Sequence, residues 1–145
     1  MSSNLFLSKE EEQKVVEAIQ SAEQQTSGEI RIHIESTCSG HVLDRAAWLF
    51  RSLRMHKTGQ RNGVLIYLSV KDRKFAIIGD AGINAVVPAG FWDDARDLMI
   101  GHFSKGELVE GFVLGIGKVG EKLKEFFPFQ KDDANELSNE ISFGK

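Results

Sequence analysis

Oxygen-bearing side chains at separate places in the sequence could together hold a metal ion. Glu29 opens an alternating stretch, Asn62 lies in a turn before an apolar run, and Asp80 follows the next strand-like segment. Asp93 and Asp94 come shortly afterwards. Hard cations such as Ca²⁺ and Mg²⁺ are bound by carboxylate, amide and main-chain oxygens. These five residues are therefore candidate ligands of a divalent cation, provided that the fold brings them together.

A helix and a half-buried strand are predicted at the start of the chain. Ser8 and Glu11 form the pattern of a capping box, in which the serine oxygen accepts a helix amide and the glutamate reaches back. A helix should begin there, and Ser27-Gly28 should end it. Residues 29–35 then alternate three Ile with polar residues, which predicts a strand with one apolar face.

A helix over residues 43–55 leads into a predicted hairpin. Apolar residues at three- and four-residue spacing indicate the helix. Residues 64–70 are almost unbroken in apolar character, as in a strand buried on both faces. Lys71-Asp72 can turn the chain into a second strand over residues 73–79. The first strand, the helix and the next strand should form a right-handed parallel crossover, and the hairpin adds an antiparallel neighbour.

This topology places the candidate ligands at one edge of the sheet. The two parallel strands start at that edge and the antiparallel strand finishes there, so Glu29, Asn62 and Asp80 should converge. The following loop leads to Asp93 and Asp94. Each residue also has a structural interpretation, because acids are favoured in the first turn of a helix and Asn-Gly and Gly-Asp pairs are common in turns.

The second half of the chain completes a three-layer prediction. Pro88 suits the first turn of a helix, and a last helix is expected from about Lys105 to Phe127, before Pro128. Residues 129–145 are polar without a clear period and are expected to form a loosely ordered tail. The predicted fold is α/β, a three-layer α/β/α sandwich over residues 1–128, with a mixed sheet of about four strands and helices on both faces.

Composition excludes several classes of function. With 145 residues, 41% of them hydrophobic, the chain can bury the core of one domain. A net charge of −3 gives no overall basic field for nucleic acid, and a single Cys38 excludes an internal disulfide and thiolate zinc sites. No signal peptide and no membrane-spanning run is apparent. We therefore expect a cytoplasmic, soluble monomer.

Three further patterns have weaker chemical interpretations. Residues 115–120 match the dinucleotide fingerprint G-x-G-x-x-G, but a helical period runs through them, which favours close helix packing. Cys38 and His41 could form a nucleophilic pair, although a buried thiol beside a loop histidine is the simpler interpretation. Residues 45–61 hold five Arg and Lys and no acid, and could meet a phosphate, an acidic partner, the first helix or solvent.

Four blocks in this sequence resemble, in order, those of the TPM domain. The blocks are SGEIRIHI at 27–34, RNGVLIY at 61–67, DRK at 72–74 and GDAGI at 79–83. Residues 91–93 and 106–111 are also similar to it, so the resemblance covers roughly residues 8–127. Four blocks in the right order are more specific than any one of them. The family's name joins a thylakoid-lumen acid phosphatase, a photosystem II repair protein and a modulator of acetylcholine receptors.

The resemblance implies an α/β/α sandwich that binds a divalent cation, with calcium as the expected ion. It points most directly to Asp80, in the Gly-Asp-x-Gly block, and less directly to Asp93 and Asp94. Two functions follow as hypotheses: a calcium-binding module that acts through an unidentified protein partner, or a metal-dependent acid phosphatase. The second requires cationic groups for phosphate, which Arg31 or Arg61 could supply. No catalytic nucleophile can be assigned from the sequence.

Overall fold

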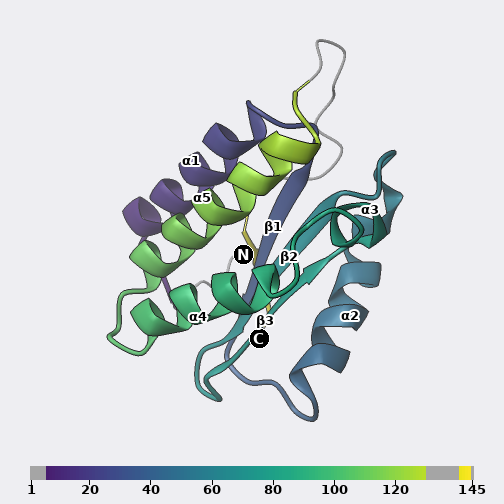
Figure 1. Cartoon of the computed structure of the whole chain (residues 1–145). Helices are drawn as coiled ribbons and strands as arrows, with labels where there is room; N and C mark the ends of the chain where they lie inside the picture. The colour runs from purple at the N-terminus through teal and green to yellow at the C-terminus, as the bar shows by residue number, and fades with distance from the viewer. Residues whose placement is uncertain (1–5, 130–140, 145) are drawn as a thin grey trace.

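The computed structural model in Figure 1 describes residues 6–129 and 141–144 of the chain. The helices are α1 (Lys9–Glu23), α2 (Val42–Ser52), α3 (Ala81–Asn84), α4 (Phe91–Phe103) and α5 (Leu108–Phe126), with a 3₁₀ turn η1 (Met55–Lys57). The strands are β1 (Glu29–Glu35), β2 (Gly63–Ser69), β3 (Lys74–Gly79) and β4 (Ser142–Phe143).

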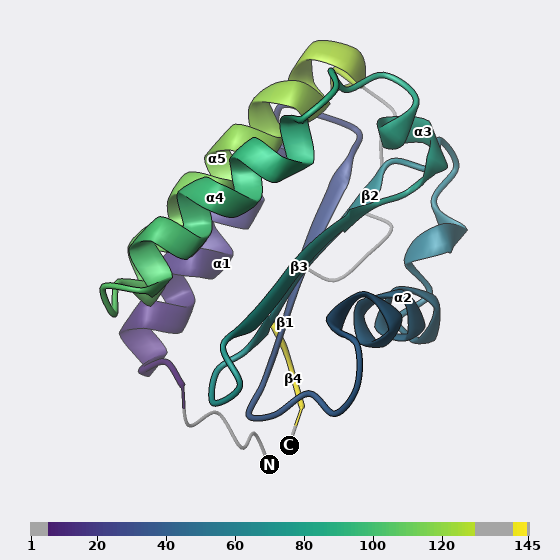
Figure 2. The same ribbon diagram turned by 60° about the horizontal axis from the view of Figure 1, so that its bottom comes forward.

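The central sheet has the strand order β3-β2-β1-β4. Strands β1 and β2 are parallel, with Glu29 opposite Gly63 and Glu35 opposite Ser69. Strands β2 and β3 form the antiparallel hairpin. Helices α1, α4 and α5 lie on one face of the sheet and α2 on the other (Figure 2). The three-layer α/β/α architecture, the parallel pair and the hairpin are therefore confirmed.

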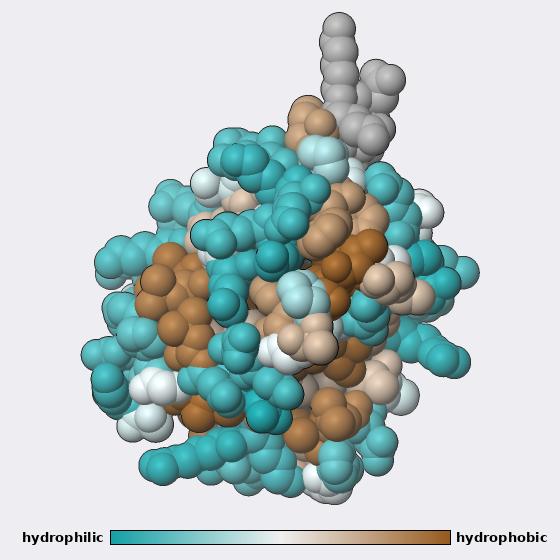
Figure 3. Space-filling view, viewed as in Figure 1, coloured by the Kyte–Doolittle hydropathy of each residue, from teal (hydrophilic) through white to brown (hydrophobic). Residues whose placement is uncertain are grey.

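Two hydrophobic clusters separate the layers. The larger one joins α1, α4 and α5 to the face of β1 that carries Ile30, Ile32 and Ile34. The smaller one joins α2 to the other face, where Leu65 and Tyr67 lie. Both faces of β2 are thus buried, as its unbroken apolar run predicts. On the outer surface seen in Figure 3, hydrophobic residues lie in separate patches among hydrophilic ones.

The helix ends differ in part from those expected. The capping box is present, because the Glu11 amide donates to Ser8 Oγ at 3.1 Å and the Ser8 amide donates to Glu11 Oε1 at 2.8 Å. Helix α1 ends at Glu23, before Ser27-Gly28, and Thr26 instead pairs with Pro128. Helix α4 begins at Phe91, after Pro88.

Helix α5 runs straight through the glycine motif at residues 115–120. A Cβ on Gly115 would lie 2.2 Å from Met99 Sδ of α4, so this glycine permits close approach of the two helices. The packing interpretation of the motif is confirmed, and the strand-to-helix context that a dinucleotide site needs is absent from this described segment.

The C-terminal segment needs a correction. Residues 130–140 and 145, which belong to the expected loose tail, lie outside the described residues. Within residues 141–144, however, Ser142–Phe143 forms β4, which pairs in parallel with His33 and Ile34 of β1. Backbone hydrogen bonds to the sheet edge hold this short strand despite its lack of a sequence period. None of the helices in the described ranges combines the length and the apolar character that a membrane crossing requires.

Candidate functional site

The backbone brings Glu29, Asn62 and Asp80 to one edge of the sheet. The Glu29 amide donates to the Asn62 carbonyl at 3.4 Å, at the point where β1 and β2 begin. The Asp80 amide donates to the Gly63 carbonyl at 2.9 Å, where β3 ends. The strand topology alone creates this proximity, as the sequence predicts.

Asp80 is already paired through both of its carboxylate oxygens. Arg61 Nε donates to Oδ2 at 2.8 Å and Arg61 Nη2 to Oδ1 at 2.8 Å, while the Ala81 amide caps α3 through Oδ1 at 2.7 Å. Burial opposes ionisation of this carboxyl, but Arg61 and the Ala81 amide outweigh it and hold the pKa of Asp80 below its ordinary value. Asp80 is therefore ionised and has a resident cationic partner.

Steric crowding explains the second glycine of the Gly-Asp-x-Gly block, Gly82. Gly82 donates its amide to the Arg61 carbonyl at 2.8 Å. A Cβ at position 82 would lie only 2.2 Å from the Gln60 carbonyl oxygen, and that neighbour is backbone. Arg61 itself has φ of +53°, a left-handed conformation. The close contact between residues 60–61 and Gly82 thus holds the Arg61 side chain against the Asp80 carboxylate.

Asn62 is buried, with 1% of its surface exposed. The backbone amide of Asn62 donates to Thr58 Oγ1 at 3.2 Å, and its side-chain Nδ2 donates to Ser27 Oγ at 3.3 Å. Its side-chain oxygen Oδ1 is buried and has no hydrogen-bond partner within the described residues. Such atoms are uncommon in native proteins, and they call for an explanation.

Glu23 joins Glu29 in this region, although the sequence analysis did not select it. Glu23 Oε2 accepts the Ile30 amide at 2.8 Å, across the turn between α1 and β1. Burial raises the pKa of Glu23 to about 8, and the charge of the buried Glu29 adds to this rise against the opposing Ile30 hydrogen bond. A signal was available, because an acid in the last turn of a helix opposes the helix dipole.

Asp93 and Asp94 do not join the buried edge. Both are exposed in the first turn of α4, and Asp93 keeps 75% of its side chain in solvent. Their helix contacts α3 through Trp92, whose Nε1 donates to Asn84 Oδ1 at 2.9 Å. Across residues 6–129 and 141–144, no group of three or more His, Cys, Asp or Glu side chains is arranged to hold a metal ion.

A second polar cluster lies at the opposite end of β1, around Glu35. Arg45 Nε and Nη2 donate to this buried carboxylate at 2.9 and 2.8 Å, and the Tyr67 hydroxyl also donates to it. His33 Nε2 lies 3.1 Å from Glu35 Oε1. Burial opposes ionisation, but these partners, Arg45 first, lower the pKa of Glu35 to about 2.

Cys38 and His41 form no hydrogen bond with each other within the described residues. Cys38 is buried, whereas His41 is exposed and its Nδ1 accepts the Leu43 amide at 3.2 Å as the cap of α2. The structural interpretation of Cys38 and His41 therefore fits the contacts better than the nucleophilic one.

Comparisons with known proteins agree with this architecture. A family model described as the TPM domain matches residues 2–122. The NMR structure of the BA42 protein from the psychrophilic bacterium Bizionia argentinensis is 48% identical, with a TM-score of 0.91 and 99% of each chain covered. No curated protein matches the chain.

Two more distant NMR structures share the fold. The N-terminal domain of a P. gingivalis protein is 22% identical, with a TM-score of 0.68 and coverage of 85% of this chain and 80% of that one. The N-terminal domain of a Corynebacterium glutamicum protein is 16% identical, with a TM-score of 0.59 and coverage of 83% and 76%.

Proposed function

Because the chain belongs to the TPM domain family, we propose that it is a divalent-cation-binding domain and that its ion is Ca²⁺. The donors that we assign are the carboxylates of Glu23 and Glu29 and the amide oxygen of Asn62. The observation that carries the assignment is the buried Asn62 Oδ1, which has no partner within the described residues and belongs to the edge where β1 and β2 begin. The pKa of Glu23, which burial and the charge of Glu29 raise to about 8, supports it. The negative charge of the buried Glu29 opposes ionisation of the half-buried Glu23 carboxyl, and a bound cation would favour it.

The chemistry of the three donors suits a hard cation. Ca²⁺ takes six to eight oxygen ligands from carboxylates, amide and main-chain carbonyls and water, in flexible geometry. Binding of the ion favours the ionised form of Glu23, and the buried Asn62 Oδ1 gains a partner. As a regulatory module, the domain would present this loaded edge to a protein partner.

Asp80, Asp93 and Asp94 take different parts in this proposal. Asp80 becomes a ligand only when Arg61 leaves it, and the Arg61 side chain, 51% exposed, has room in solvent to do so. We therefore assign Asp80 to the outer part of the site. Asp93 and Asp94 are exposed on α4 and serve as matched control positions.

Calcium titration with a proton count tests the proposal. At pH 7 the binding of Ca²⁺ should release close to one proton as Glu23 ionises, and at pH 9.5 it should release almost none. Backbone amide signals of residues 23–30 and 62–63 should shift. Glu23→Gln should abolish the proton release, and Glu29→Gln should weaken binding by about tenfold or more, whereas Asp94→Asn should bind as the wild type does.

Three results would contradict this assignment. They are the absence of any shift at millimolar Ca²⁺, shifts confined to residues 80 and 93–94, and unchanged proton release from Glu23→Gln. Mg²⁺ titrated in the same way decides between the two ions. The amide spectrum of each variant without metal shows whether it has kept its fold.

A pocket beside Asp80 favours a second candidate function, metal-dependent hydrolysis of a phosphomonoester. This cavity of about 520 Å³ lies between α2 and β3 and is lined by Arg51, His56, Arg61 and Asp80 among others. His56 Nδ1 is buried and has no partner within the described residues. Arg51 and Arg61 would hold the phosphate here, and a bound divalent cation would supply an activated water.

Hydrolysis of an aryl phosphate by the purified protein tests this second candidate. Activity should require a divalent cation and should fall in Arg51→Gln and Asp80→Asn, while Arg96→Gln on the exposed face of α4 should keep it. Equal activity in Asp80→Asn and the wild type, or activity that survives chelation, would reject a metal-dependent phosphatase at this pocket.

A further inference from the structure

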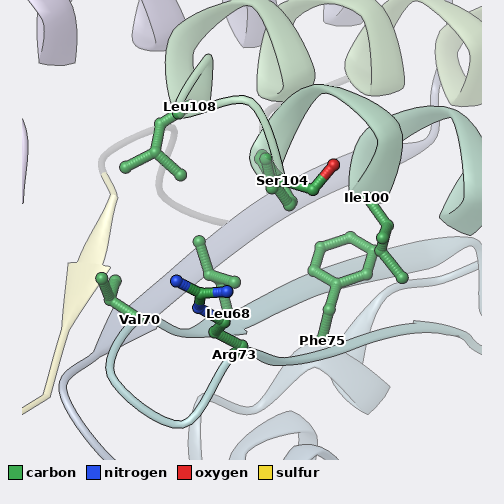
Figure 4. A pocket seen from close by; sticks show the side chains of 9 residues that line it. Leu68, Val70, Arg73, Phe75, Ile100, Ser104 and Leu108 are labelled. Atoms are coloured by element: carbon green, nitrogen blue, oxygen red, sulfur yellow. The ribbon is translucent and has the colours of Figure 1, made fainter.

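A largely apolar cavity lies on the other side of the sheet, between the β2–β3 hairpin and the turn that joins α4 to α5 (Figure 4). Its volume is about 440 Å³, within the range of small-molecule sites. Its apolar walls are formed on the sheet by Leu68, Val70 and Phe75 and on the helices by Ile100, Phe103 and Leu108.

The inner wall of this cavity is held in place by aromatic packing. The Phe103 ring meets Phe75 edge-on, with centroids 5.2 Å apart, and packs on Phe112 at 5.0 Å. Phe112 is fully buried in the core, so Phe103 is anchored on two sides. A preformed apolar wall binds a hydrocarbon without first having to be ordered.

One cation faces this apolar space. The Arg73 side chain extends from the hairpin turn toward the cavity in Figure 4 and lines it. Within the described residues its guanidinium takes part in no ion pair or hydrogen bond. Two carboxylates adjoin lining residues in the sequence, and both have other partners. Asp72, next to Arg73, accepts the Cys38 amide, and Glu107, next to Leu108, contacts His102 Nδ1 at 2.7 Å.

We propose that this cavity binds a free medium-chain fatty acid, with the alkyl chain between the sheet and the helices and the carboxylate on Arg73. An arginine can bind a carboxylate through two parallel hydrogen bonds, which an ammonium or an amide cannot do. The other polar side chain of the lining, Ser104, already donates to the Gly101 carbonyl at 3.1 Å. A ligand with one anionic end and an otherwise apolar body matches this distribution.

Titration of the full chain with decanoate, followed by amide and methyl NMR, tests the proposal. Signals of Leu68, Phe75, Ile100 and Leu108 should shift together and saturate below the concentration at which decanoate forms micelles. Decanol, which has the same chain without the charge, should bind at least about tenfold more weakly, because it cannot form the charged pair of hydrogen bonds with Arg73.

Variants separate the head group from the chain. Arg73→Asn removes the charge with a residue that tolerates the local φ of +53°, and it should bind decanoate no better than decanol. Arg96→Gln, a matched loss of charge on α4, should leave the preference unchanged. Ile100→Glu places a like charge on a half-exposed wall residue and should abolish decanoate binding without unfolding the chain.

Four results would overturn the proposal. They are equal affinity for decanol and decanoate, an unchanged preference in Arg73→Asn, shifts scattered outside the cavity, and tighter binding of a peptide with a C-terminal leucine carboxylate than of decanoate. The proposed calcium site at Glu23 and Glu29 lies on other elements of the fold. A failure to bind calcium there would therefore not affect the fatty-acid proposal.

Discussion

Each end of the central sheet holds a buried carboxylate paired with an arginine through two nitrogen atoms, yet the two ends differ in how completely their polar atoms are paired. At the end of the sheet where β1 finishes, Glu35 accepts from Arg45 and from Tyr67 and contacts His33. The ion pair, the hydroxyl and the imidazole thus form one connected network. Every oxygen of Glu35 has at least two partners there.

The opposite end has polar capacity left over. Asp80 is satisfied by Arg61, but Asn62 Oδ1 is buried without a partner among the described residues. Glu23 is held protonated near neutral pH beside Glu29. A fully paired buried network is suited to fixing the structure, whereas an unpaired buried oxygen such as Asn62 Oδ1 is suited to a ligand that completes it.

The largest effect is expected from Glu35→Gln. Glutamine keeps the volume of the side chain, but its one oxygen cannot serve Arg45, Tyr67 and His33 together, and the loss of a buried partner strands a charge. We expect a loss of about 3–5 kcal/mol in the free energy of unfolding, measured by urea denaturation. Asp80→Asn should lose clearly less, since Arg61 remains solvated and asparagine still caps α3. An equal or larger loss in Asp80→Asn would reverse the comparison.

A smaller effect with a distinctive pH dependence is expected from Glu23→Gln. The pKa of Glu23 is about 8 in the folded chain and has its ordinary value of 4.5 in the unfolded chain, so the folded state binds more protons between these values. Stability from this group is therefore present below pH 4.5 and is lost as the pH rises toward 8 and above. The wild type should lose on the order of 2 kcal/mol between pH 5 and 8 that Glu23→Gln keeps.

Urea denaturation at several pH values measures this difference. Glu17→Gln on the exposed face of α1 is the matched control and should follow the wild type. Saturating Ca²⁺ should remove the alkaline loss from the wild type, because the cation stabilises the ionised carboxylate. Parallel pH profiles of Glu23→Gln and the wild type would contradict a raised pKa for Glu23 at this end.

Local patterns were sufficient for most of the fold. The capping box fixes where α1 begins, and the unbroken apolar run of β2 followed by a turn fixes the hairpin. The two-residue β4 and the four-residue α3 are too short to have a period, so no pattern in the sequence predicts them. Strand β4 depends on hydrogen bonds to a distant edge, and α3 depends on the Asp80 cap.

The candidate site was predictable as backbone positions and not as side-chain contacts. Strand topology brings Glu29, Asn62 and Asp80 to one edge whatever their side chains do. The ion pair between Arg61 and Asp80 depends on a left-handed backbone at position 61 and on its close contact with Gly82. The position of the Glu23 carboxyl beside the start of β1 depends on the hydrogen bond that it accepts from the Ile30 amide across the turn. These are tertiary effects that spacing in the sequence does not encode.

The smallest effect, with the opposite pH dependence, is expected from His33→Asn at the Glu35 end of the sheet. Burial lowers the pKa of His33 despite its contact with Glu35, so the neutral ring persists to lower pH in the folded chain than in the unfolded chain. Because the Glu35 carboxylate only accepts, the ring proton lies on Nε2, and Nδ1 accepts from the Ser142 hydroxyl at 2.8 Å. As the pH falls through about 6.5, the unfolded chain therefore binds more protons at this residue than the folded chain does, and stability falls with the pH.

Asparagine does not titrate, and its oxygen can still accept from Ser142. His33→Asn should therefore lose less stability than the wild type between pH 6.5 and 5, above the range in which Glu35 itself titrates. His56→Asn, in the turn η1 near the other end, is the control for a general effect of removing a histidine. If His33→Asn and the wild type lost equal stability over this range, the acid sensitivity would not come from the Glu35 network, and the two ends would no longer differ in the sign of their pH response.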